Sequence, residues 1–395
     1  MKLLGKTQLV PGEASAPVGK RPAPDSRAWL EIDLQALKHN AMLLQRYLPE
    51  RCSLIAVVKA NAYGHGDIAV AKTLGDFSIR SFAVATLEEG VRLRKHKTEG
   101  EILILGYTNP DDIDLLLRYR LTQIIVDPDY AKALNKAGKK LKVHLKIDTG
   151  MHRLGVDATQ IPDIERIFAC ENLVIEGIVS HLCSSDRLTK ADISFTKQQI
   201  VRFFKIVELV KAKRDIKSHL QSSYGILNYP DISCDFARAG IALYGVLSNN
   251  NETLTKLDLH PVLALKARIA TVRKISPGES VSYGRAYTAN GEVSIAVVTA
   301  GYADGIPRNF SEGSAYVLVR AQRARVIGRI CMDQFIIDVT GIKDVRTNDI
   351  VTIIGKDGSE RIRCEDFAEQ CKTITNEILC RLGNRLNHQY FQVSG

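Results

Sequence analysis

Short apolar runs and longer amphipathic stretches alternate along the first two thirds of this 395-residue chain. The short runs are rich in Val and Ile, which is typical of strands buried on both faces of a parallel sheet. The longer stretches, such as residues 195–211, space their apolar positions as an amphipathic helix does. Segments that fit the strand pattern are residues 54–59, 82–86, 102–106, 123–126, 142–147, 175–180, 219–222 and 236–238. Eight strands alternating with helices predict a TIM-like α/β barrel. A doubly wound sheet is the alternative, but the G-x-G-x-x-G turn expected after its first strand is missing.

The pattern changes near residue 260, after which strand-like runs are separated by turns such as Pro277-Gly278 and Asp357-Gly358. This pattern indicates a mainly antiparallel β domain, with helices expected near residues 364–371 and 376–386. Its expected strands are residues 264–272, 294–299, 315–319, 335–339 and 350–354. The proline-containing N-terminus shows no periodicity. We therefore divide the chain into a flexible extension (1–27), a barrel (28–260) and a β domain (261–395).

The composition is that of a soluble globular protein, with 45% hydrophobic and 25% charged residues. No apolar run approaches the roughly 20 residues of a membrane helix, and the N-terminus lacks a secretory pattern. We expect a cytoplasmic protein. The formal charge of +10 is scattered without a basic stripe, so we expect no nucleic-acid partner. None of the 8 cysteines forms a C-x-x-C pair, so we expect neither a disulfide framework nor a metal site.

Polar residues follow several of the predicted barrel strands, where barrel enzymes place their active sites. Lys59 is the last residue of the first predicted strand. Burial there would lower the pKa of its amine and make the amine nucleophilic. Such an amine can form a Schiff base with a carbonyl, including that of pyridoxal phosphate. The alternative is that the side chain extends past the strand end into solvent. Further polar strand ends carry Lys146, Arg153, His181, Ser223 and Arg238. Their charges suit an anionic ligand.

Six motifs in this chain resemble those of alanine racemases, which are fold-type III pyridoxal-phosphate enzymes. The first is AVVKANAYGHG, which begins at Ala56 and contains Lys59. The others are KIDTGMHRLG, RAGIALYG, VSYGRAYT, AGYADG and GRICMDQ. They occur in the family's order over about residues 28–385. The resemblance implies a barrel with a C-terminal β domain, working as a homodimer on L- and D-alanine.

The resemblance implies two catalytic bases. Lys59 matches the lysine that binds pyridoxal phosphate covalently, and Tyr283 matches a tyrosine that reaches the site from the partner subunit. Racemisation requires a base on each face of the substrate, because one removes the α-proton and the other returns it to the opposite face. A tyrosine of ordinary pKa, near ~10, is a poor base at neutral pH, so its neighbours matter.

The resemblance also implies which residues bind the cofactor ring and its phosphate. Arg238 matches the arginine at the pyridine nitrogen, while His181 and His219 match histidines linked to it in a chain toward Tyr283. Without the resemblance, the better interpretation of both histidines is that of ordinary hydrogen-bonded residues at strand ends. The expected phosphate contacts are Tyr63, Ser223, Gly240 and Ile241.

Substrate contacts follow from the same resemblance. Arg153 matches an arginine near the cofactor's phenolate oxygen and the substrate carboxylate. Met332 matches a residue whose backbone N–H meets that carboxylate, and Tyr302 lines the entrance; packing at the domain junction is the alternative role for both. Lys146 occupies a position at which some members carry a carbamylated lysine that orients the arginine.

Two positions depart from the family pattern. Tyr224 replaces a small residue beside Ser223, and Asn384 stands where well-known members have a tyrosine that narrows the pocket. We therefore predict an alanine racemase that supplies D-alanine for peptidoglycan, with a broader serine-accepting racemase as the alternative. A decarboxylase of basic amino acids is a further alternative, but it is expected to pair the ring nitrogen with a carboxylate instead of Arg238.

Overall fold

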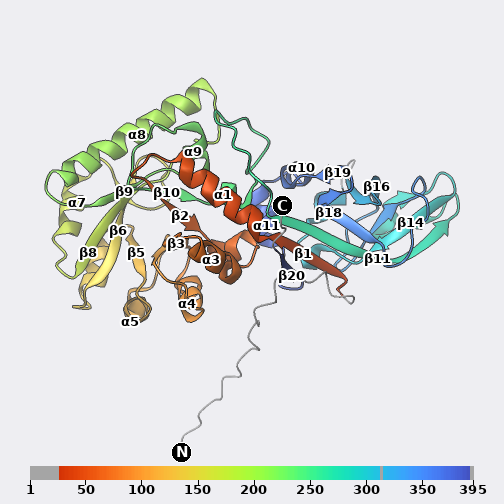
Figure 1. Cartoon of the computed structure of the whole chain (residues 1–395), viewed down its shortest axis with the longest axis horizontal. Helices are drawn as coiled ribbons and strands as arrows, with labels where there is room; N and C mark the ends of the chain where they lie inside the picture. Colours follow the sequence, from red (N-terminus) through yellow and green to blue (C-terminus); the bar gives the residue numbers. More distant parts are fainter. Residues whose placement is uncertain (1–25, 312–314, 392–395) are drawn as a thin grey trace, which may run out of the picture.

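The structure, a computed structural model, describes residues 26–311 and 315–391. Two lobes lie side by side, a barrel surrounded by helices and an elongated β domain (Figure 1). Residues 1–25 of the predicted extension lie outside the described residues. No helix in the described ranges combines the length and apolar character needed to cross a membrane.

The barrel is a closed ring of parallel strands. Its order is β5-β4-β3-β2-β10-β9-β8-β6, and β6 pairs back onto β5. The strands are β2 (Ser53–Val57), β3 (Ser81–Val84), β4 (Glu101–Ile104), β5 (Thr122–Ile125), β6 (Leu141–Asp148), β8 (Leu173–Val179), β9 (Lys217–His219) and β10 (Phe236–Ala239). The predicted barrel is confirmed, although β9 ends at His219, before most of the segment predicted for it.

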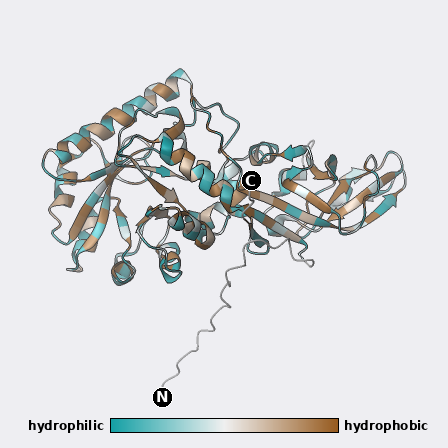
Figure 2. Ribbon diagram, viewed as in Figure 1, coloured by the Kyte–Doolittle hydropathy of each residue, from teal (hydrophilic) through white to brown (hydrophobic). Residues whose placement is uncertain are grey.

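Helices surround the barrel strands, whose side chains are largely hydrophobic (Figures 1 and 2). The predicted helical segments fall within α3, α4 and α8. The helices are α1 (Leu34–Tyr47), α2 (Lys59–Tyr63), α3 (Asp67–Asp76), α4 (Leu87–Lys95), α5 (Ile113–Arg118), α6 (Pro128–Asn135), α7 (Ile161–Phe168), α8 (Lys190–Lys211) and α9 (Ser223–Asn228).

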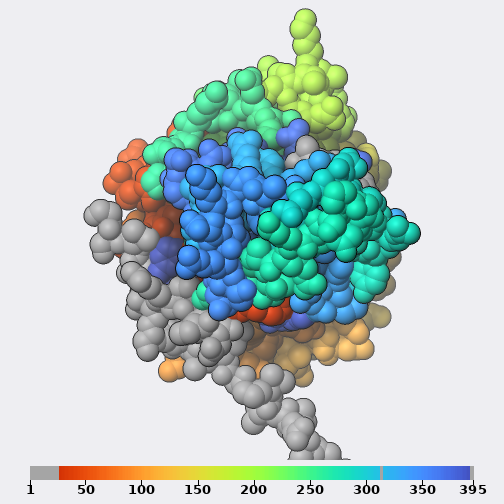
Figure 3. Space-filling model, turned by 90° about the vertical axis from the view of Figure 1, so that its right-hand side faces the viewer, coloured from red at the N-terminus to blue at the C-terminus, as the bar shows by residue number. Residues whose placement is uncertain are grey.

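The β domain contains a second closed ring, because β11 pairs with both β14 and β18. All pairs in this ring are antiparallel, as the turn pattern predicts. The ring strands are β11 (Leu263–Ile275), β14 (Val293–Val298), β15 (Tyr316–Val319), β16 (Gln322–Ile327), β17 (Phe335–Asp338) and β18 (Ile350–Asp357). Smaller elements of this domain are β12 (Ser280–Val281), β13 (Tyr287–Thr288), β19 (Glu360–Ile362), α10 (Cys364–Gln370) and α11 (Thr375–Arg381), whereas the short β7 (Val156–Asp157) pairs with β6 of the barrel. Seen from its free end, this domain lies in front, and parts of the barrel are visible around it (Figure 3).

The first strand of the described chain belongs to the β domain. β1 (Ala28–Asp33) pairs antiparallel with β11 and parallel with β20 (Asn387–Phe391). The prediction that residues from 28 onward belong to the barrel is therefore wrong for this strand. Leu30 and Ile32 are fully buried, so β1 contributes apolar area to the β-domain sheet. The chain then enters α1 and the barrel.

Arg27, which the sequence places in the flexible extension, is anchored. Its Nη1 donates to Asp304 Oδ2 at 3.0 Å and to the Thr299 carbonyl at 2.7 Å. Asp304 is fully buried and also accepts from the Gly301 N–H at 2.9 Å. Arg385 lies farther from this carboxylate, at 3.7 Å. Arg27 thus ties the start of β1 to the loop after β14.

We expect Arg27→Gln to lower the free energy of unfolding by about 1–3 kcal/mol, because a buried carboxylate would lose its main charged donor. Urea unfolding measures the change. Arg320→Gln is the control, since Arg320 pairs with Asp349 at the surface and its loss should lower the free energy of unfolding much less. Equal losses in the two variants would contradict the anchoring role of Arg27.

Candidate active site

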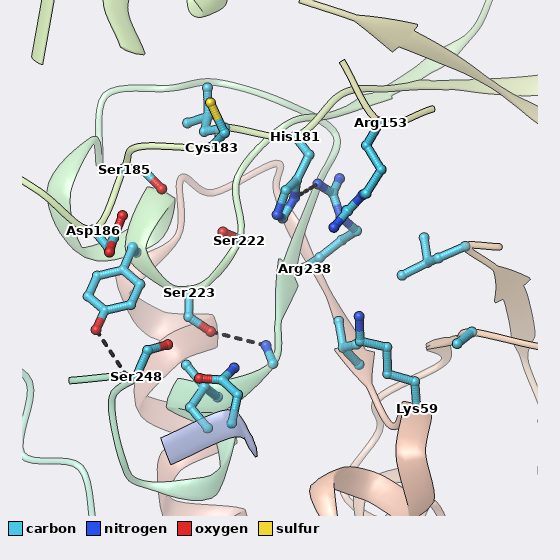
Figure 4. Close-up of a pocket in the computed structure, with 18 of the residues that line it drawn as sticks. Lys59, Arg153, His181, Cys183, Ser185, Asp186, Ser222, Ser223, Arg238 and Ser248 are labelled. Carbon is cyan, nitrogen blue, oxygen red and sulfur yellow. Dashed lines mark hydrogen bonds between the residues drawn. The ribbon is translucent and has the colours of Figure 1, made fainter. Parts of the chain in front are cut away.

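A cavity of about 560 Å³ opens at the carboxyl ends of the barrel strands. The sequence-predicted residues that line it are Lys59, Tyr63, Lys146, Arg153, His181, Ser223, Arg238, Gly240 and Ile241. Figure 4 shows His181, Arg153 and Arg238 grouped on one side, with Lys59 extending toward them. The barrel thus brings together residues that are far apart in the sequence.

The backbone that follows Lys59 makes a left-handed turn. Residues 60–63 all have φ between 52° and 54°, and none of them is glycine. This conformation costs roughly 1–2 kcal/mol per residue, so its surroundings must hold it. Glu89 does so from α4, because its Oε1 accepts from the Ala60 N–H at 2.6 Å and its Oε2 from the Ala85 N–H at 2.7 Å. The turn places Lys59 and Tyr63 in one cavity.

Two buried lysines face other cations in this cavity. Burial, and then the charge of Arg153, lower the pKa of Lys59 below its usual range. Burial lowers the pKa of Lys146 to about 7, and the charges of Arg238 and Arg153 contribute. Both amines therefore hold their protons less tightly than a solvated lysine. A neutral amine is the nucleophilic form.

Arg238 is a buried guanidinium held by the ends of neighbouring strands. Its Nη2 donates to the carbonyls of Ser180 at 2.7 Å and Leu220 at 3.0 Å. Its Nη1 donates to His219 Nδ1 at 2.8 Å, and His181 Nδ1 lies 3.3 Å from Nη2. Burial lowers the pKa of Arg238 to about 10, which still leaves it charged at neutral pH.

A chain of side chains leads from Arg238 back into the barrel. Arginine only donates, so His219 Nδ1 accepts, and the proton of His219 sits on Nε2. That nitrogen lies 2.9 Å from His144 Nδ1, and His144 Nε2 lies 3.3 Å from Glu101 Oε1. Burial and the charge of Arg238 lower the pKa values of His219 and His181 well below their usual range, so both are neutral. The chain therefore runs from the Arg238 cation to the Glu101 carboxylate through the rings of His219 and His144.

Ser223, Gly240 and Tyr63 form a cradle at the other end of the cavity. Ser223 Oγ accepts from the Gly240 N–H at 3.1 Å and the Ala242 N–H at 3.2 Å (Figure 4). A Cβ on residue 240 would lie 2.8 Å from Tyr63 Oη, so glycine keeps this space open. Hydroxyl and backbone N–H groups around open space suit a phosphate.

The residues present fit pyridoxal phosphate. The cradle offers hydrogen-bond donors to a phosphate, and the cavity's cations favour an anion. Lys59 supplies a buried amine for a carbonyl carbon, and Arg238 supplies a fixed donor for a ring nitrogen. Ser223 with Gly240 and Ile241 would hold the phosphate end, and Lys59 the reactive end.

The structure does not bring Tyr283, Met332 and Tyr302 into this cavity within one chain. Tyr283 lies in the short helix η3 (Tyr283–Arg285) and is 70% exposed. It shares a surface cavity with Met332, and Tyr302 lines another beside Arg381. Ser282 Oγ donates to the Arg329 carbonyl at 2.9 Å and fixes the loop that carries Tyr283. The predicted chain toward Tyr283 thus has no link to it inside one subunit.

The two departures from the family pattern have different surroundings. Tyr224 lines the cavity wall, and its hydroxyl accepts from the Ser248 N–H at 3.0 Å. Asn384 is exposed and lies outside the cavity lining. Tyr224 therefore narrows the cavity, whereas Asn384 does not widen it within this chain.

Sequence reasoning missed three residues of the site. His144 interrupts an apolar strand between Val143 and Leu145, and that polar position was the available signal. Glu101 begins β4 and resembles a solvated strand end. Asn376 on α11 lines the cavity, and its side-chain oxygen has no hydrogen-bond partner among residues 26–311 and 315–391.

We expect Glu101→Gln to reduce stability in a pH-dependent way. Burial alone raises the pKa of Glu101, but the hydrogen bond and charge of His144 outweigh it and lower the pKa below 4.5. A lowered pKa stabilises the folded state above the unfolded value, and this stability is lost as the pH falls through the folded value. The difference in free energy of unfolding between wild type and variant, measured by urea unfolding, should be largest at pH 7 and decrease below about pH 4.5. A gap that widens on acidification would contradict this assignment.

Comparisons with known proteins agree with this geometry. The family model for the N-terminal domain of alanine racemase matches residues 32–248, and that for the C-terminal domain matches residues 262–390. Alanine racemase from Halothermothrix orenii is 38% identical over 92% of this chain and 96% of its own length. A serine/alanine racemase from Enterococcus gallinarum is 44% identical over 93% of this chain but 52% of its own length. The chain thus spans about half the length of that relative.

Solved structures give the same result. The alanine racemase from Bacillus anthracis with bound L-Ala-P superposes with a TM-score of 0.87 at 28% identity, over 94% of this chain and 96% of that one. The alanine racemase from E. faecalis superposes with a TM-score of 0.86 at 32% identity, over 92% and 98%. With both domain models matched in order and the fold shared, the chain belongs to the alanine racemase family.

Proposed function

We propose that this protein interconverts L-alanine and D-alanine with pyridoxal phosphate bound to Lys59. The observation that supports the proposal is the barrel cavity, which is lined by the Lys59 amine of lowered pKa, the fixed guanidinium of Arg238 and the phosphate cradle. Membership of the alanine racemase family supports it. When bound, pyridoxal phosphate supplies an electron-withdrawing ring that acidifies the α C–H bond of an amino acid.

Lys59 would act twice. Its Nζ would hold the cofactor covalently, and the same amine would take or return the α-proton on one face of the substrate. Burial and Arg153 favour its neutral form, which bonding to a carbonyl carbon and removal of a proton both require. Arg153 would attract the substrate carboxylate, and Lys146 beside it adds positive charge to the same wall.

Arg238 would hold the ring nitrogen as a hydrogen-bond donor. Its other N–H groups are committed to strand-end carbonyls and His219, so its position is fixed. A guanidinium retains its proton, and the ring therefore withdraws electrons less strongly than a protonated one. This arrangement favours return of the proton over side reactions such as transamination. A decarboxylase of the related kind is disfavoured, because the donor here is arginine.

Tyr283 would be the base on the opposite face, contributed by a second copy of the chain. It is exposed and separated from the barrel cavity, as expected for a residue that completes a partner's site. Met332 shares its surface and would reach the same carboxylate. A symmetric dimer would then hold two sites, each built from both subunits.

We assign alanine as the substrate. Tyr224 occupies the cavity wall and Asn384 lies outside it, so the two departures from the family pattern do not enlarge the cavity. The name of the Enterococcus gallinarum relative includes serine, which makes serine the comparison substrate. We propose a cytoplasmic enzyme whose D-alanine supplies peptidoglycan.

We expect the purified protein to be yellow and borohydride to fix the cofactor on the peptide that contains Lys59. Lys59→Ala should remove this label, because no other amine would have the same position. Peptide mass mapping checks both results, and racemisation of L-alanine, L-serine and L-lysine should be fastest with alanine. A label on Lys146 with none on Lys59 would contradict the assignment.

We expect Tyr283→Phe to slow racemisation about 10²–10⁴-fold, the range for loss of a general base. Borohydride labelling of Lys59 should persist, because Tyr283 lies outside the cofactor cavity. Mixing this variant with Lys59→Ala and exchanging subunits should restore about one quarter of wild-type activity, since half the dimers would contain one intact site. Absence of recovery after verified exchange would show that both bases come from one chain.

A further inference from the structure

A cluster of His39, Asp258 and His260 lies outside the active site. His39 is on α1, and the other two are on the segment that connects the barrel to β11. One ligand atom from each of the three lies within 4.8 Å of the others. His260 Nε2 is 3.3 Å from Asp258 Oδ2, and His39 Nε2 is 2.9 Å from the Asp258 carbonyl. Groups from two chain segments therefore lie close together at this place.

Asn40, the neighbour of His39, holds this arrangement in place. Its side chain is fully buried, accepts from the His260 N–H at 2.8 Å and donates to the His260 carbonyl at 2.7 Å. This two-way bond fixes the backbone of His260 against α1. The rings of His39 and His260 stack at 4.1 Å between centroids, with 11° between their planes. Asn40 thus fixes the His260 backbone, while the stacked rings would have to turn out of parallel for both imidazoles to reach one ion.

The donor set selects a class of metal ion. Two imidazole nitrogens and one carboxylate oxygen suit Zn²⁺ and its late first-row neighbours, whereas Mg²⁺ and Ca²⁺ prefer oxygen ligands. Three protein ligands leave a coordination position for water, and an adjoining cavity of about 910 Å³ gives access to it. Both basic residues (Lys356 and Arg361) and acidic residues (Glu31 and Asp33) line this cavity, so its charge is mixed.

We propose that His39, Asp258 and His260 bind a divalent late first-row transition-metal ion such as Zn²⁺. The ion would join α1 to the segment between the two lobes. This differs from the expectation of no metal site, which rested on the spacing of cysteines. The proposal is independent of the racemase assignment, because none of the three residues lines the active-site cavity.

Equilibrium dialysis of the holoenzyme against Zn²⁺, with metal analysis, tests this site. The wild-type protein should bind one Zn²⁺ whose affinity falls at least about tenfold in His39→Ala, His260→Ala and Asp258→Asn, as expected when one of three protein ligands is lost. His96→Ala is the matched control, because His96 is an exposed histidine that bonds the Arg92 carbonyl within its own helix. This control should bind as the wild type does.

Thermal unfolding of the same proteins gives a second measurement. Zn²⁺ should raise the melting temperature of wild type and His96→Ala, because it binds only the folded cluster, and should not raise that of the three variants. Racemase activity of the variants shows that they are folded. Binding that survives in all three would place the metal elsewhere, for example at exposed Cys183 or Cys380, and would overturn the proposal.

Discussion

The active site depends on a positive charge buried at the ends of β8, β9 and β10. A guanidinium of which only 4% is exposed would be costly without partners, and Arg238 obtains them from carbonyls that the barrel cannot pair in its own ladder. The closed barrel and the fixed cation therefore require one another. Gly177 contributes to the same arrangement, because a Cβ there would lie 2.7 Å from the His144 ring. Removal of any one partner leaves the others unsatisfied.

This charge also explains the protonation of its neighbours. Four basic side chains, Lys59, Lys146, Arg153 and Arg238, line the cavity, and the carboxylate of Asp186 lines it as well. Burial, and then the neighbouring cations, lower the pKa values of both lysines and of His181. A chain of two histidines connects Arg238 to a carboxylate, that of Glu101. An anionic ligand would therefore relieve repulsion as well as gain contacts.

The sequence predicted the barrel well because its strands are buried on both faces and appear as continuous apolar runs. It misplaced β1, because chain order suggests that the first strand joins the barrel, whereas its partners β11 and β20 lie more than 200 residues away. Lys59, Arg238 and the phosphate cradle were accessible from motifs. Glu101 and His144 were not, since their contact depends on the closure of the barrel. The left-handed turn at residues 60–63 carries no glycine that would have indicated it.

That turn has a geometric consequence. Lys59 stands at one end of it and Tyr63 at the other, and a main chain in this unusual conformation has little freedom to stretch or contract. Its outer side is closed by α11, since a Cβ on Gly64 would lie 2.2 Å from the Leu379 carbonyl. The fixed backbone of residues 60–63 therefore sets the distance between the amine of Lys59 and the phosphate cradle. A ligand whose carbonyl carbon and phosphate are closer together or farther apart than this distance would contact either Lys59 or the phosphate cradle, but not both.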